Sequence, residues 1–370
     1  MPGSSYDRYG LMSNPFRELS SESVEDVEVY HVNMDVDRSL EAIKEEVFAK
    51  ENRAIIALVG LHGAGKTERL LLTLAEARER KAFAVYFDVT TKTTWVVRGL
   101  ATAIAKAANL GGFRQVFGAP RWFREVAAQT KLKDQNYDPV KAGRAIADAL
   151  NANAPSVLLL NDLHNLAKSS ELGLLAKTLQ EAIDVTKPGV LIMFGAYPNF
   201  MVQLATQQPP LASRINRSLL LPRLTDDEAA LMIAKKLLAK RLVDGLDPLY
   251  PFDKEAIARL NQTAWGNPRR LLELADVAME YGVAHRTYRI DAEVVRSALM
   301  ERQVRDVKSM VETKAAAWEE DRPRQGGGVG SGPAVGPAIP KADATPPPAV
   351  KAVERQASLP GRTPPTSGRP

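Results

Sequence analysis

The sequence predicts an α/β fold in which helices cover both faces of a parallel sheet, followed by a smaller all-helical region. Short apolar runs alternate with segments of helical periodicity from residue 54 to 221, and this alternation is typical of parallel sheets. Beyond residue 225 the periodic segments are all helical. The length of 370 residues, of which 45% are hydrophobic, is sufficient for two or three packed domains.

Each predicted element has its own signal. Strands are expected at the apolar runs 54–59, 83–89, 189–195 and 219–221 and at the start of 156–165. Apolar spacing predicts helices over 37–50, 66–80, 94–110, 138–151, 173–186, 228–241, 253–263, 267–281 and from 291 onward. Gly111 and Gly112 end one helix, residues 225–228 form a capping box for another, and Pro268 suits a first helical turn.

The stretch 54–67, AIIALVGLHGAGKT, is the most informative part of the chain. An apolar strand breaks into a glycine-rich turn, and the turn matches the phosphate-binding pattern G-x-x-x-x-G-K-[ST] at every fixed position. In such a loop, backbone N–H groups face an anion at the positive end of a helix. We expect Lys66 to neutralise the β- and γ-phosphates and Thr67 to bind Mg²⁺. The predicted nucleotide contacts are Gly60, Leu61, His62, Gly63, Ala64, Gly65, Lys66, Thr67 and Glu68.

Composition limits the remaining function classes. The chain has no cysteine, which excludes disulfides and thiolate metal sites. No apolar run approaches the roughly 18 residues of a membrane helix, and the N-terminus lacks a secretory signal, so we expect a cytoplasmic protein without membrane contact. Residues 321–370 contain eleven of the 24 prolines and a Gly-Gly-Gly run, which predicts a disordered tail.

The net charge of +5 is unevenly distributed. Residues 1–50 hold five basic and eleven acidic residues (−6), and residues 321–370 hold seven basic and three acidic ones (+4), which leaves +7 for 51–320. A basic middle permits a nucleic-acid partner without requiring one. Aromatic residues interleaved with arginines in 113–137 fit a stacking surface for nucleic acid; an insertion packed on its own domain is the commoner alternative.

Residues 156–165, SVLLLNDLHN, form the second informative stretch, an apolar run that ends in polar residues. After a phosphate loop, such a strand presents the ligands of magnesium and of the attacking water. This segment resembles the I-D-E-A-H and I-D-D-L-H endings of AAA+ ATPases in the origin-recognition initiator and ExeA-like group. The resemblance covers roughly residues 10–305 and implies an AAA+ core with a small helical lid, with ATP and Mg²⁺ as ligands.

On this pattern Asn161 occupies the position of the magnesium-ordering Asp, Asp162 that of the water-polarising Glu, and His164 that of the trailing His. Asn161 has no negative charge, and Asp162 is one methylene shorter than Glu. In a shifted alignment Asp162 becomes the magnesium partner, and Leu163 then occupies the base position. Either way one carboxylate is missing, which predicts that nucleotide binding persists while hydrolysis is slow.

The resemblance implies three further roles. Asn199 matches the sensor 1 position that faces the γ-phosphate; a helix cap or turn residue is the alternative. Arg214, or Arg217 in its place, matches the arginine finger that reaches a neighbour's γ-phosphate; a plain surface arginine is the alternative. Arg269, or Arg270 if the register slips, matches the sensor 2 arginine of the lid; an arginine at a helix start without a ligand is the alternative.

The predicted organisation is a lead-in (1–37) packed on the core, a nucleotide-binding domain (38–224), a helical lid (225–305) and an extension (306–370). Tyr9, Leu11 and Phe16 would pack the lead-in, or form one wall of the adenine pocket. Initiators of the resembling type usually carry a winged-helix domain after the lid, and few structured residues are expected for one here.

We therefore expect an ATP-binding AAA+ protein with Asp162, Asn199 and Arg214 as catalytic residues and with Thr67 and Asp162 at the metal. It would be a slow ATPase that acts as a nucleotide-dependent switch, with ATP and ADP as ligands. Self-association or a protein partner is expected through the arginine finger, and DNA is a further candidate partner. Asn161 favours the alternative, a non-hydrolysing scaffold with a structural nucleotide. A DNA-remodelling or replication-associated ATPase is a third interpretation.

Overall fold

The structure is a computed structural model that describes residues 5–17, 27, 30–93, 95–108, 119–129, 131 and 137–320, with 307–320 described by their backbone alone. The chain divides into one compact unit, Met1–Thr313, and a second, Lys314–Pro370. In the second unit the described backbone is the end of a helix that reaches Glu320. The predicted tail from 321 lies outside the described residues.

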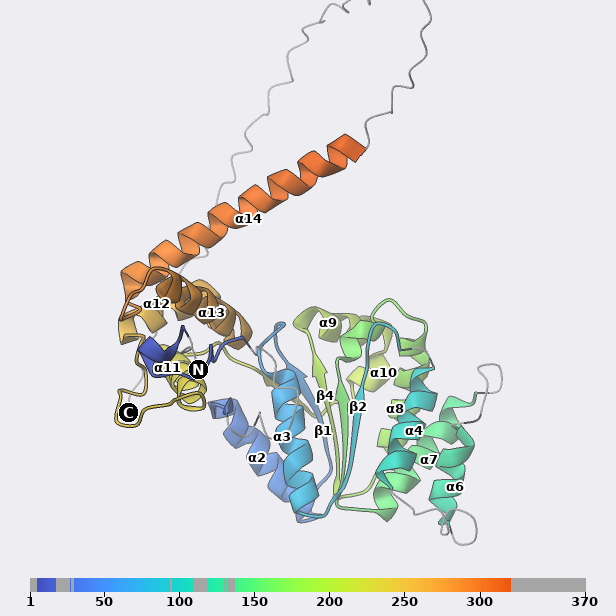
Figure 1. Ribbon diagram of the computed structural model, residues 1–370. Coiled ribbons are helices and arrows are strands. Elements are labelled where there is room, and N and C mark those ends of the chain that lie inside the picture. The colour runs from blue at the N-terminus through green and yellow to red at the C-terminus, as the bar shows by residue number, and fades with distance from the viewer. Residues whose placement is uncertain are drawn as a thin grey trace, which may run out of the picture. The chain divides into compact units, whose positions relative to one another are not determined.

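A five-stranded sheet forms the centre of the first unit (Figure 1). Its order is β2-β3-β4-β1-β5, and all its neighbouring strands are parallel. The carboxyl ends of the strands therefore meet at one edge. The predicted α/β fold with a parallel sheet is confirmed. The strands are β1 (Ala54–Val59), β2 (Phe83–Asp88), β3 (Ser156–Asn161), β4 (Val190–Ala196) and β5 (Arg217–Leu220).

Helices cover both faces of the sheet because alternate strand residues are apolar on both sides (Figure 1). Ile56 and Leu58 of β1 pack with α2 (Asp35–Phe48) and α3 (Lys66–Glu79). Ile55, Ala57 and Val59, on the opposite side of β1, pack against the second layer of helices. That layer contains α4 (Val96–Ala107), α6 (Arg121–Gln129), α7 (Pro139–Ala152), α8 (Glu171–Val185), α9 (Pro198–Gln207) and α10 (Pro209–Ala212).

The helical region after the sheet has its own hydrophobic cluster. It is built from α11 (Asp226–Leu238), α12 (Lys254–Ala264), α13 (Pro268–Ala284) and the start of α14 (Ala292–Glu320). Tyr9, Leu11 and Phe16 belong to this cluster and are fully buried. These three side chains of the lead-in therefore pack among the helices after the sheet, where Phe16 lies against Phe252 with ring centres 5.8 Å apart.

Part of the aromatic stretch 113–137 forms α6, which packs on its own domain. The ring centres of Trp122 and Phe83 lie 6.1 Å apart, and Phe123 is buried. These two side chains of the stretch serve packing, as the commoner alternative predicted. Phe113 and Phe117 lie outside the described residues.

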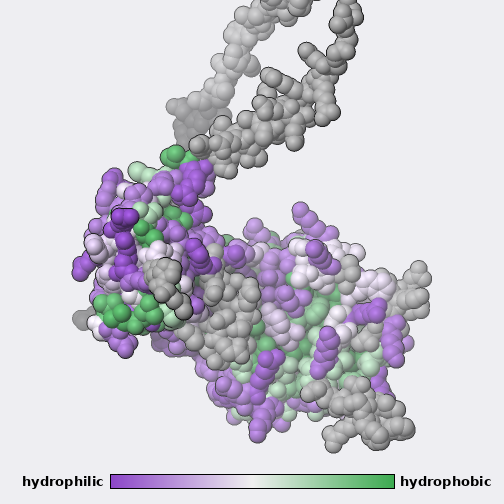
Figure 2. Space-filling model, viewed as in Figure 1, coloured by the Kyte–Doolittle hydropathy of each residue, from purple (hydrophilic) through white to green (hydrophobic). Residues whose placement is uncertain are grey.

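Polar side chains cover most of the face shown in Figure 2, and the hydrophobic ones form separate, smaller areas. Within the described part of the chain, no helix combines the length and the apolar character needed to cross a bilayer.

The packing of α7 against α8 depends on Gly143. A Cβ at this position would lie 2.6 Å from the Thr178 carbonyl oxygen and 2.7 Å from the Glu181 Cβ. We predict that Gly143→Val lowers the free energy of unfolding by about 1–3 kcal/mol in urea titrations. Gly173→Ala is the matched control, because its Cβ would meet only the Gln208 amide at 3.6 Å; it should be neutral or stabilise by up to about 1 kcal/mol. Equal midpoints for both variants would contradict this account.

Candidate nucleotide-binding site

The predicted site residues gather at the edge where the strands end. A cavity of about 250 Å³ lies there, between the phosphate loop after β1, the residues after β3 and β4, and the helices α11 and α13. The predicted residues that line this cavity are His62, Gly63, Gly65, Lys66, Thr67, Glu68, Asp162 and Arg269. A larger hollow of about 840 Å³ runs along β2 between α3 and α4, and no phosphate-loop residue is among its described walls.

The loop conformation requires glycine at two positions. Gly63 and Gly65 have φ angles of +75° and +87°, a region that side chains disfavour. A Cβ on Gly63 would also lie 2.5 Å from the Cβ of Arg269. Gly65 precedes α3, so Lys66 and Thr67 stand in its first turn, where unpaired N–H groups make the helix end electropositive.

Lys66 is buried at the mouth of the loop. Its ammonium donates hydrogen bonds to the carbonyl oxygens of Gly60 (3.0 Å) and Leu61 (2.8 Å), and it lies 4.4 Å from the ring centre of Tyr197. Burial lowers the pKa of Lys66 to about 8, although Asp162 acts in the opposite direction. A phosphate beside Lys66 would favour its charged form and so oppose the effect of burial.

Thr67 is linked to two strand ends by its hydroxyl. The hydroxyl donates to Oδ1 of the buried Asn161 (3.0 Å), and the Asn161 amide donates in turn to Asp88 Oδ1 (2.9 Å) at the end of β2. Because Thr67 uses its proton in this bond, its oxygen lone pairs remain for a cation. The hydroxyl and the nearby Asp162 carboxylate are hard oxygen donors, which suit Mg²⁺.

Asp162 follows β3 in a left-handed conformation, with φ 53° and ψ 40°. A residue other than glycine is uncommon in this region, and tertiary structure must maintain it. Its carboxylate lines the cavity and lies 3.9 Å from His164 Nδ1. Asp162 is thus placed with Lys66 and Thr67; its catalytic role stays a prediction.

The residue that reaches the cavity after β4 is Tyr197, two positions before the predicted Asn199. The Tyr197 hydroxyl lies 3.1 Å from His62 Nδ1, and its ring lies against that of His164, with centres 3.8 Å apart and planes tilted by 38°. Asn199 is exposed in the first turn of α9 and is not among the described cavity-lining residues. The sequence reasoning chose an amide for its hydrogen-bonding capacity and passed over the aromatic residue at the strand end.

The lid meets the phosphate loop at the start of α13. Asn267 caps this helix through Oδ1, which accepts from the Arg270 N–H (3.1 Å), and its Nδ2 donates to the His62 carbonyl (2.7 Å). The Arg269 N–H donates to the Gly63 carbonyl (3.3 Å). The Arg269 side chain lines the cavity and pairs with Glu273 at 3.3 Å. Arg270 does not line this cavity.

Six of the described cavity-lining residues were not predicted as site residues: Tyr30, Tyr197, Met232, Lys236, Pro268 and Leu272. The Lys236 ammonium lies 3.7 Å from the ring centre of Tyr30. The lead-in therefore contributes to the cavity through Tyr30 rather than through the aromatic residues that the sequence singled out. For Met232 and Leu272 the only signal in the sequence was the apolar spacing of α11 and α13. That spacing predicts a buried position, but it does not distinguish a residue that lines a cavity from one in the hydrophobic core.

Arg214 lies at the other edge of the sheet, where the strands begin. Asn216, two residues later, accepts a hydrogen bond from the Ile55 N–H at the start of β1 (2.9 Å). Arg214 Nε and Nη2 each donate a hydrogen bond to one oxygen of the Asp184 carboxylate, both at 2.6 Å. The structure does not bring Arg214 to the cavity of its own chain, and its role toward a neighbouring molecule stays a prediction.

Glu68 lines the cavity and is also part of a charged network around α3. His31 lies 2.6 Å from Glu68 and 3.5 Å from Asp37, which forms two hydrogen bonds with Arg69. Burial opposes protonation of His31, but its hydrogen bonds to the two carboxylates outweigh burial and raise its pKa. Burial likewise opposes ionisation of Asp37, and bonds to His31 and Arg69 lower its pKa to about 2.

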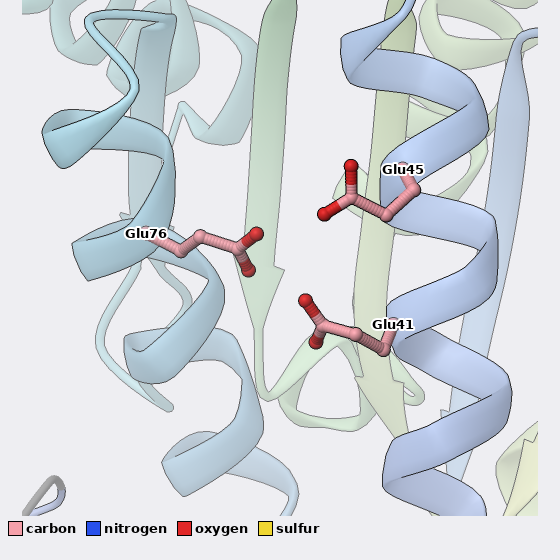
Figure 3. Close-up of side chains that lie close together, drawn as sticks. All are labelled: Glu41, Glu45 and Glu76. Atoms are coloured by element: carbon pink, nitrogen blue, oxygen red, sulfur yellow. The ribbon is translucent and has the colours of Figure 1, made fainter.

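Three further carboxylates, those of Glu41, Glu45 and Glu76, converge between α2 and α3 (Figure 3). Their oxygens lie within 4.8 Å of one another. Lys44 contacts Glu41 at 2.6 Å and also pairs with Glu76, while Arg80 contacts Glu76 at 2.8 Å and Glu45 at 3.1 Å. Each of the three carboxylates is paired with Lys44 or Arg80, so we interpret the cluster as an ion-pair network between the helices.

Comparison with known proteins places this geometry in a family. Residues 49–201 match the model of the AAA domain. An uncharacterized HTH-type transcriptional regulator of Methanocaldococcus jannaschii is 27% identical over 146 residues, which are 39% of this chain and 34% of that protein. This chain therefore spans about a third of the length of that curated relative.

Solved structures are similar in fold. The Aeropyrum pernix ORC2 protein, in ADPNP and ADP complexes, has a TM-score of 0.50 and 13% identity, over 77% of this chain and 71% of that chain. The Aeropyrum pernix ORC1 protein in complex with DNA has a TM-score of 0.48 and 18% identity, over 79% and 72%. At 13% identity the likeness to the ORC2 protein concerns the fold alone.

The lowered pKa of Lys66 predicts how nucleotide affinity depends on pH. Phosphate groups favour the protonated lysine, so affinity should fall as pH rises through about 8, by about tenfold between pH 7 and pH 9. The phosphates add no titration there, because their second pKa is about 6. Calorimetric titration with ATP would measure the change. Lys66→Arg is the control, because guanidinium stays charged. A profile of the natural chain as flat as that of Lys66→Arg would contradict the prediction.

Proposed function

Since this chain carries an AAA domain on a P-loop NTPase sheet, with a fold shared with an origin-recognition protein, we propose that it binds ATP with Mg²⁺ and hydrolyses it slowly as a nucleotide-dependent switch. The observation that supports this best is the convergence of Lys66, Thr67, Asp162 and Arg269 on one cavity. Two of these residues come from the phosphate loop, one from the neighbouring strand end and one from the lid.

Each of these residues has a role that follows from its position. The Lys66 ammonium neutralises phosphate charge, and the N–H groups of the α3 first turn bind the phosphate oxygens. The Thr67 hydroxyl holds the metal, which when bound supplies charge neutralisation at the β- and γ-phosphates. Asp162 orients the attacking water. Arg269 exchanges its pairing with Glu273 for the γ-phosphate.

The switch in this proposal is the contact between lid and loop. Asn267 donates a hydrogen bond to the His62 carbonyl, and the backbone N–H of Arg269 donates one to the Gly63 carbonyl. Because these bonds attach the start of α13 to the phosphate loop, a change at the phosphates would move this helix. ATP would thereby favour one arrangement of lid and core over another. Arg214 would connect this change to a neighbouring copy or a protein partner by exchanging Asp184 for that neighbour's γ-phosphate.

A non-hydrolysing scaffold is the second candidate function, and Asn161 favours it. The strand end beside Thr67 carries an amide where the resembling ATPases have a carboxylate. Nucleotide binding depends mainly on the loop and survives such a change, whereas hydrolysis also requires a positioned water and compensated charge.

Nucleotide binding followed by phosphate release tests both candidates. We predict that ATP and ADP bind to the natural chain and that Lys66→Ala weakens ATP binding at least about tenfold, because a charge-assisted bond to phosphate is lost. Asp162→Asn should keep binding and lose phosphate release. Lys187→Ala removes an exposed lysine far from the loop and serves as control. Binding without any release would favour the scaffold, and unaltered ATP binding by Lys66→Ala would refute the site.

Association with DNA is a further proposal, supported by the charge of +7 over residues 51–320. Retention of the ATP-loaded chain on immobilised duplex DNA should be strong at about 50 mM salt and should fall steeply as salt increases, since phosphate contacts release counterions. A column without DNA is the control. No retention at about 50 mM salt would exclude this proposal.

A further inference from the structure

The end of β2 offers a carboxylate beside the amide that interrupts the magnesium site. Asp88 is the last residue of β2, and the register of the parallel pair sets it directly opposite Asn161 at the end of β3. Asp88 Oδ1 accepts from Asn161 Nδ2 at 2.9 Å, and Asn161 Oδ1 accepts from the Thr67 hydroxyl at 3.0 Å. Three groups from separate elements thus form one continuous hydrogen-bonded chain.

This chain fixes the orientation of the Asn161 amide. A carboxylate only accepts hydrogen bonds, so Asp88 requires the NH₂ group of the amide on its side and leaves the amide oxygen facing Thr67. The Thr67 hydroxyl must then donate, and its lone pairs point away to the position of a cation. With the opposite amide orientation, NH₂ would donate to the hydroxyl oxygen and occupy a lone pair that the metal needs.

Asp88 also brings negative charge to this edge. Asp88 itself is exposed at the end of β2, whereas the Asn161 amide that joins it to Thr67 is only 4% exposed, so the link between them passes through a buried group.

We propose that Asp88 is the second carboxylate of the magnesium site, a positioning residue that acts on the ion through Asn161 and Thr67. This inference rests on the proposed function. The signal was hidden in the sequence because Asp88 lies 73 residues before Asn161 and outside every motif.

Exchanging the two groups tests the proposal. The measurement is the dissociation constant of ATP in Mg²⁺ and in EDTA, for the natural chain, Asp88→Asn, and the double variant Asp88→Asn with Asn161→Asp. The exchange keeps one amide and one carboxylate in contact and sets the carboxylate directly beside Thr67. Asp148→Asn, an exposed change of equal charge on α7, is the control.

We expect Asp88→Asn to reduce the Mg²⁺-dependent gain in ATP affinity by about 10–100-fold, as is typical for groups that orient metal ligands, and to change affinity in EDTA by less than about twofold. The double variant should recover the gain, and Asp148→Asn should keep it. The exchange remains informative even if Asp88→Asn alone fails to fold, because it retains the contact.

Two outcomes would overturn the proposal separately from the function. An unchanged Mg²⁺-dependent gain in Asp88→Asn would show that the carboxylate does not serve the metal. Equal losses in Mg²⁺ and EDTA, not recovered by the exchange, would show that Asp88 only joins two strands. By contrast, no ATP binding by the natural chain in either condition would overturn the proposed function and this inference together.

Discussion

The parallel register of the sheet is the constraint on which the site depends. Because all five strands run in one direction, the chain after each strand emerges at the same edge. The end of β3 carries Asn161, and β4, which lies between β3 and β1, delivers Tyr197 beside the phosphate loop. A strand inserted in the opposite direction would remove its end from this edge and with it a wall of the cavity. The strand topology therefore determines which side chains can meet at the site.

The cavity lies between two hydrophobic cores. One core belongs to the sheet and its helices, the other to α11–α14 and the lead-in. Contacts between the loop and α13 include hydrogen bonds to backbone carbonyls, such as Asn267 to His62, and Ala64 of the loop packs in the helical core. Hydrogen bonds exchange with water at little net cost, whereas opening a packed core is expensive.

Charge is handled differently on the two sides of α3. On the side of α3 that faces α2, carboxylates of both helices pair with Lys44 and Arg80, and these ion pairs link the two helices. At its first turn Lys66 is buried among carbonyl oxygens, with Asp162 as the carboxylate that acts on its pKa. Among its described residues, the ion-pair network has no free cation to offer an anionic ligand. Lys66 would gain an anionic partner at the first turn, which is where we propose that the phosphates bind.

The sequence by itself determined the features that depend on neighbouring residues. The phosphate loop could be predicted because its pattern, from Gly60 to Thr67, is contained in a few consecutive residues. The α/β fold could be predicted because strand and helix periodicities alternate along the chain. The AAA+ recognition rests on these same stretches and is confirmed by the family match to residues 49–201. Only the tertiary structure decided that Tyr197 rather than Asn199 reaches the cavity, that Tyr30 and Lys236 form its wall, and that Asp88 stands behind Asn161. Those contacts join residues that are distant in the chain, and they depend on strand register and on helix packing, which no local pattern encodes.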